Sequence, residues 1–73
     1  MDIVFYFIAS SMQDRRALVK YLLTMQISFF YDGDTERIMI DGIDETKADK
    51  IARGAKMWGT ESPIRVEADY LTF

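Results

Sequence analysis

Three carboxylates alternate along one short segment of this chain, at Asp32, Asp34 and Glu36. Carboxylate oxygens are the ligands that Mg²⁺ and Ca²⁺ prefer, so this spacing is a candidate metal site. A calcium-binding loop that begins at Asp32 would need glycine at its sixth position and glutamate at its twelfth, where this chain has Arg37 and Ile43. Aspartate is also favoured in tight turns for reasons of its own. We therefore expect a solvated turn here, with no metal and no cofactor.

The chain lacks several side chains that nucleophilic and acid-base catalysis commonly use, because it contains no histidine, no cysteine and no asparagine. This removes the Ser-His and Cys-His pairs, the imidazole and thiolate metal ligands, and the commonest general base near neutral pH. The segment from Gly54 to Thr60 has the two-glycine spacing of a phosphate-binding loop, but no lysine follows the second glycine. The sequence predicts that the protein is not an enzyme.

The hydrophobic pattern indicates which elements position these side chains. An apolar run predicts a strand at residues 2–9, and the change of period after it predicts a helix at about 12–25. Ser10 and Ser11 are both suited to cap this helix, and Ser10 with Gln13 has the form of a capping box. A hairpin signal follows, in which residues 27–31 and 37–40 form strands on either side of Asp32-Gly33.

The second half of the chain repeats this order of elements. Asp44 is placed to cap a helix whose stripe of small apolar residues ends at Trp58, and Gly59 suits the positive φ that ends a helix. Pro63 can begin a last strand, in which apolar and charged residues alternate. The order resembles the ferredoxin-like fold, βαββαβ. We expect one α+β domain over residues 1–73, with a four-stranded antiparallel sheet, strands 1 and 3 central, and both helices on one face.

The ferredoxin-like resemblance implies no functional residues, because many unrelated functions use this scaffold. Two helices can nevertheless cover only one face of the sheet. Alternation directs eight side chains toward them: Ile3, Phe5, Phe7, Ile38, Ile40, Ile64, Val66 and Ala68. On the opposite face we expect an apolar centre with charge along one side, as in a protein-protein interface. The predicted partner-binding residues are Val4, Tyr6, Ile8, Phe30, Met39, Arg65, Glu67 and Asp69. The alternative is that the tail from Leu71 to Phe73 covers this face, or that the face only tolerates a few apolar groups.

Charge is divided between the predicted elements. Of the nine basic residues, seven lie in the predicted helices, while most acidic residues outside them lie in the hairpin and the last strand. This predicts a basic helical layer and an acidic edge. A nucleic-acid-associated protein is the first alternative, binding through Arg15, Arg16, Lys20, Lys47, Lys50 and Arg53. The net charge of −3 argues against strong non-specific affinity for nucleic acid, and residues 37–40 lack the basic, glycine and aromatic run of RRM domains.

Length and composition set the class of protein. A chain of 73 residues with 49% hydrophobic and 29% charged residues is typical of one small folded domain. The apolar opening is too short to span a membrane and lacks the basic start of a signal peptide, so we expect a cytoplasmic protein of the producing or host cell.

A small acidic domain of this kind fits a regulator or inhibitor of a larger protein complex, acting as a homodimer or on a protein partner. Bacteriophage-encoded antagonists of host enzymes or defence systems often have this format. A small-ligand sensor with its site at a dimer interface is the other alternative. ACT domains share the topology and bind ligands in this way, but the chain has none of their motif residues.

Overall fold

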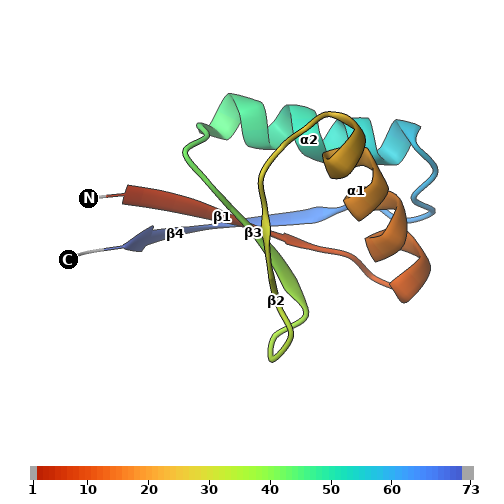
Figure 1. The fold of residues 1–73 in the computed structure, drawn as a ribbon, viewed down its shortest axis with the longest axis horizontal. Helices are drawn as coiled ribbons and strands as arrows, with labels where there is room; N and C mark the ends of the chain where they lie inside the picture. The colour runs from red at the N-terminus through yellow and green to blue at the C-terminus, as the bar shows by residue number, and fades with distance from the viewer. Residues whose placement is uncertain (1, 72–73) are drawn as a thin grey trace.

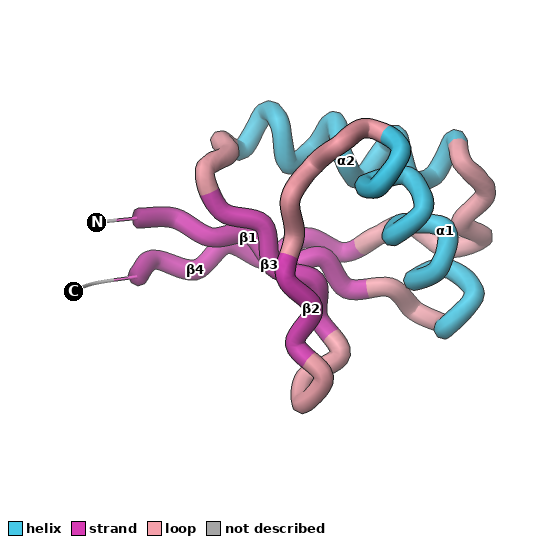
Figure 2. The backbone as a smooth tube through the Cα atoms, viewed as in Figure 1, coloured by secondary structure: helices cyan, strands magenta, loops and turns pink. Residues whose placement is uncertain are grey.

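The computed structural model describes residues 2–71, with side chains from residue 3 to residue 70 (Figure 1). The strands pair antiparallel in the order β2-β3-β1-β4, and both helices lie on one face of the sheet (Figure 2). This confirms the predicted ferredoxin-like α+β fold with strands 1 and 3 central. The elements are β1 (Asp2–Ile8), α1 (Met12–Thr24), β2 (Phe30–Asp32), β3 (Arg37–Asp41), α2 (Glu45–Met57) and β4 (Arg65–Leu71).

The core lies between the sheet and the two helices. Alternation along the strands turns apolar side chains toward the helices, where they meet the apolar stripes of α1 and α2. The buried core residues are Phe5, Phe7, Leu18, Leu22, Ile38, Ile40, Ala48, Ile51, Ala55 and Ile64, with Val66 partly buried. Ile3 and Ala68 were predicted to face the helices but are exposed. The start of β1 and the end of β4 project past the beginning of α2, so no helix covers them (Figure 1).

The start of α1 differs from the predicted capping box. Ser11, not Ser10, is the N-cap, and its Oγ accepts a hydrogen bond from the backbone N–H of Asp14 at 3.1 Å. Both serines can cap a helix, and the helix begins one residue later than the Ser10 and Gln13 pattern requires.

The second strand is shorter than predicted. Gln26 has a φ of 57°, and the N–H of Ile27 donates to the carbonyl of Leu22 at 2.9 Å, so the chain is still bound to the end of α1 at Ile27. Residues 27–29 are not part of a strand. β2 then contains only Phe30–Asp32. In the turn that follows, the positive φ falls on Glu36, at 57°, and not on Gly33. The predicted hairpin is present, with a shorter first strand and a different turn.

The helices approach each other closely at one glycine. A Cβ added to Gly54 of α2 would overlap the hydroxyl and ring carbons of Tyr21 of α1. The Tyr21 ring also meets Trp58 edge to face, with 5.8 Å between centroids. Trp58 remains 40% exposed, so it fills the space at the end of α2 only in part. Asp44 caps α2 as predicted, and Gly59 ends it with a φ of 113°.

Candidate partner-binding surface

The sheet face opposite the helices carries one row of apolar side chains. Directly opposed residues of antiparallel strands share a face, and the register pairs Met39 with both Phe30 and Tyr6. Phe30 is 64% exposed, whereas Met39 and Tyr6 are half-buried. We call these three residues the apolar row. It crosses β2, β3 and β1 and ends on β4 at Glu67, which is the partner of Tyr6 on that side.

Two rows of opposite charge flank the apolar row. On one side, Val4 of β1 lies between Asp41 of β3 and Asp69 of β4; we call these residues the acidic row. On the other side, Ile8 pairs with Arg65, and one further step of the β1–β3 register places Arg37 beside Ile8. We call Arg37, Ile8 and Arg65 the basic row; on β2 the same row continues to Asp32, which pairs with Arg37.

The basic row is held in place by contacts within the sheet face. The guanidinium of Arg37 lies 3.9 Å from the centroid of the Tyr6 ring, a cation-π contact. Arg65 forms an ion pair with Glu67 at 3.1 Å. The Arg37 guanidinium therefore occupies one face of the Tyr6 ring.

One predicted partner-binding residue is not accessible. Val4 is 2% exposed, although its side chain lies on the face opposite Phe5 and Phe7. Its cross-strand neighbours are Asp41 and Asp69, and the chain's own atoms already cover it, so it is not available to a partner. The other seven predicted residues keep at least part of their surface: Tyr6, Ile8, Phe30, Met39, Arg65, Glu67 and Asp69. Residues 72–73 and the side chain of Leu71, which could cover this face, lie outside the described part of the chain.

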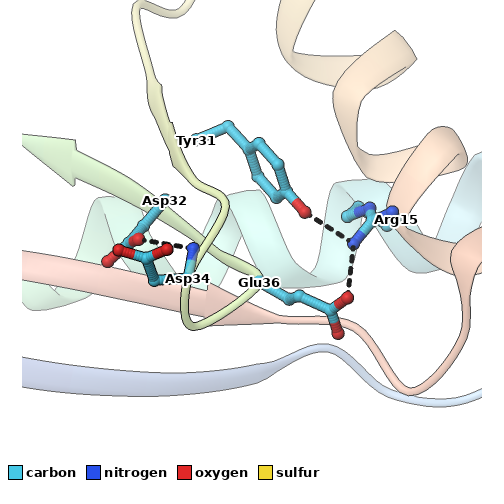
Figure 3. A network of polar contacts seen from close by, with 5 residues as sticks. All are labelled: Arg15, Tyr31, Asp32, Asp34 and Glu36. Atoms are coloured by element: carbon cyan, nitrogen blue, oxygen red, sulfur yellow. Dashed lines mark hydrogen bonds and ion pairs between the residues drawn. The ribbon is translucent and has the colours of Figure 1, made fainter.

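The turn carboxylates are engaged in shaping the hairpin. Oδ1 of Asp32 accepts a hydrogen bond from the backbone N–H of Asp34 at 3.0 Å (Figure 3). A hydrogen bond with the Thr35 side chain and this backbone bond hold the pKa of the Asp32 carboxyl below its ordinary value. Glu36 points instead toward Arg15 of α1. Between residues 2 and 71, no three acidic side chains are grouped so that they could hold a metal ion.

The predicted nucleic-acid-binding residues are only partly available. Nη1 of Arg15 donates to the Tyr31 hydroxyl at 2.9 Å and lies 4.0 Å from the Glu36 carboxylate (Figure 3). Arg53 pairs with Asp49 at 2.9 Å. The other four residues of this set are exposed on the helices: Arg16, Lys20, Lys47 and Lys50. The basic helical layer is present, and two of its six proposed contacts are engaged within the chain.

The expected single acidic edge is not formed. The sheet order places the hairpin at one edge and β4 at the other, so the acidic residues of these two segments lie on opposite sides of the molecule. Asp41 and Asp69 instead flank β1 in the acidic row. The sequence could not show this, because it depends on which strands are neighbours.

Two further features were not predicted. Asp14 is 2% exposed, and its two carboxylate oxygens accept the backbone N–H groups of Glu61 and Ser62 at 2.9 and 3.1 Å. This buried carboxylate ties α1 to the loop before β4 and is fully occupied in doing so. A groove of about 420 Å³ also lies where the strand ends project, lined by Ile3, Phe5, Asp44, Glu45, Ala48, Asp49, Val66, Ala68 and Tyr70. The signal for the groove is the apolar alternation that continues to Tyr70.

The two helices contain 13 residues each, and neither has the length and apolar composition needed to cross a bilayer within the range the structure describes.

The three rows of the open sheet face are the best-defined candidate site. No protein-family model, no curated protein and no solved structure matches this chain.

Proposed function

We propose that this chain is a non-enzymatic protein-protein interaction module that binds its partner through the open face of the sheet. It would act as a small regulator or inhibitor of a larger protein complex, in the cytoplasm of the producing or host cell. The observation that carries the proposal is the apolar row of Phe30, Met39 and Tyr6, which lies across three strands with no helix over it.

The composition of the face supports a protein partner. Protein interfaces combine an apolar centre with a charged rim, and here charged side chains lie on both sides of the apolar row. Phe30 exposes 64% of its surface on an edge strand, where it contributes little to the core. Burial of this exposed aromatic side chain would therefore stabilise a complex with a partner more than the side chain stabilises the fold.

The environment of the buried acid Asp14 supports a non-enzymatic role. The Asp14 carboxylate is the kind of buried acid that could act in catalysis, but both of its oxygens are bound to backbone N–H groups. Its position is explained by the connection between α1 and the loop before β4.

The experiment is a pair of matched substitutions of methionine by aspartate. Met39→Asp places a charge in the centre of the apolar row, and Met57→Asp places the same charge at a site that is 88% exposed at the end of α2. Self-association is measured by sedimentation, and partner binding by capture from the native host. We expect Met39→Asp, and likewise Tyr6→Glu, to abolish binding while the circular dichroism stays unchanged and Met57→Asp binds normally. Normal binding by folded Met39→Asp would refute the proposal.

A further inference from the structure

The open face carries its charges in an order that a second copy of the same face can match. β3 and β4 each contain an arginine followed four residues later by an aspartate, Arg37 with Asp41 and Arg65 with Asp69. Both strands run antiparallel to β1, which lies between them. The two arginines therefore lie at one end of the face and the two aspartates at the other.

The apolar row lies midway between these charges. Residues two apart along a strand are separated by roughly 7 Å, so the acidic and basic rows lie roughly 7 Å on either side of it. A two-fold axis that runs along the apolar row exchanges the two sides. It brings Asp41 of one copy over Arg37 of the other and Asp69 over Arg65.

The other simple two-fold arrangement is unfavourable. An axis parallel to the strands would leave each row over itself, so that Asp41 would face Asp69 and Arg37 would face Arg65. Like charges brought together in this way oppose binding. The charge pattern therefore selects one orientation of the two copies.

The two arginines would turn outward in this orientation. In the structure they lie along the sheet face, Arg37 over the Tyr6 ring and Arg65 on Glu67. Sheets pack face to face about 10 Å apart, a gap that an arginine turned outward and an aspartate bridge together. Each apolar row meets its own copy, and the exposed Phe30 becomes covered. Glu67 would face its own copy at the β4 edge, where its ion pair with Arg65 offsets the charge, and Asp32 lies beside Arg37 at the β2 edge.

We propose that the partner of the open face is a second copy of this chain, packed face to face about a two-fold axis along the apolar row. This inference rests on the proposed function and specifies its partner. Three rows on four strands cover roughly 20 by 20 Å, which is less than the roughly 800 Å² per partner of a typical stable interface. A dimer with a micromolar dissociation constant is expected.

Charge exchange between two variants tests the orientation. One variant carries Arg65→Asp and the other carries Asp69→Arg, both on the edge strand β4. With the axis along the apolar row, each variant alone would place like charges over like charges and sediment as a monomer, whereas an equimolar mixture would form a heterodimer that native mass spectrometry identifies by mass. With an axis parallel to the strands, each substitution would instead place opposite charges over each other, at Arg37 or at Asp41, and each variant alone would dimerise more tightly than the unmodified chain. The control is Lys50→Asp on α2, which changes the net charge as much as Arg65→Asp does and should still dimerise.

The outcomes separate this inference from the proposed function. Heterodimers from the mixture, with monomers from each variant alone, support the inference. If the unmodified chain stays monomeric at high micromolar concentration while Met39→Asp loses capture of another protein, the inference is wrong and the proposed function stands. If the unmodified chain dimerises and either variant alone dimerises as tightly or more tightly, the axis is wrong and the inference fails. If the unmodified chain neither dimerises nor captures a partner, both fail.

Discussion

Replacing Phe30 by serine should weaken binding at the open face. The loss should be larger for a symmetric dimer, which buries two Phe30 side chains, than for a complex with a different protein, which buries one. Fully burying a phenylalanine side chain is worth about 1.5–3 kcal/mol, and Phe30 leaves 64% of its surface for a partner to cover. Each buried copy then contributes about 1–2 kcal/mol, and a symmetric dimer contains two, or about 2–4 kcal/mol. The dimer dissociation constant should rise by about 30- to 700-fold, at 1.4 kcal/mol for each factor of ten.

A foreign partner would give a smaller effect. Only one Phe30 is buried in such a complex, so the expected loss is about 1–2 kcal/mol, or about 5- to 30-fold in the dissociation constant. The fold should survive in either case, because Phe30 lies on an edge strand and is exposed.

The assay is sedimentation over a concentration series, with Leu23→Ser as the control. Leu23 lies on α1 and is also 64% exposed, so its replacement removes a comparable exposed apolar side chain from the helical layer. We expect Leu23→Ser to leave the dimer unchanged. If Phe30→Ser changes the dissociation constant by less than about threefold, or if Leu23→Ser has an equal effect, the apolar row is not the contact surface.

Three further predictions concern the fold and the charges. Gly54→Ala should lower the free energy of unfolding in urea by about 1–2 kcal/mol, because the clash with Tyr21 exceeds the gain in helix propensity. The same substitution made in a Tyr21→Ala variant should raise the free energy of unfolding of that variant, because the clash is then gone. Asp14→Asn should cost about 1–3 kcal/mol in the same measurement, because an amide offers one acceptor oxygen to two buried N–H groups; a change within about 0.5 kcal/mol would contradict this. Raising NaCl from about 0.1 to about 1 M shortens the Debye length from about 10 to about 3 Å and should weaken the dimer by about tenfold in sedimentation, whereas an unchanged or tighter dimer would show that the charged rows do not face each other.

The fold could be predicted from the sequence because several local signals agree. The apolar strand at the start of the chain, the switch to helical period after it, and the capping residue Asp44 each place an element independently. Right-handed crossovers then leave one sheet order and one face for the helices. The errors were local: of the two candidate caps, Ser11 begins α1, so Ser10 and Gln13 form no capping box, and Ile27 binds the end of α1 while residues 27–29 do not extend β2.

The candidate site could be predicted only as a set of residues on one face. Alternation placed Tyr6, Met39 and Phe30 on one face, as the strand register does, because every second residue of a strand shares a face. It could not show that Val4 is buried, since burial depends on the neighbouring strands and not on the strand itself. Asp14 was missed for the same reason, because its partners lie 47 and 48 residues away in the sequence.

The sequence did contain a signal for the charged rows, but the signal becomes readable only when the strand order is known. Arg37 and Asp41 have the same spacing as Arg65 and Asp69, and neither pair stands out alone. Once β3 and β4 both flank β1 and run parallel to each other, the equal spacing sorts the four charges by sign. A face that needed only solubility would gain more from interspersed charges than from sorted ones. The separation of arginines from aspartates is therefore better explained by binding to a surface that carries the same charges in reverse order. A second copy of this face, rotated by 180° about the apolar row, is such a surface.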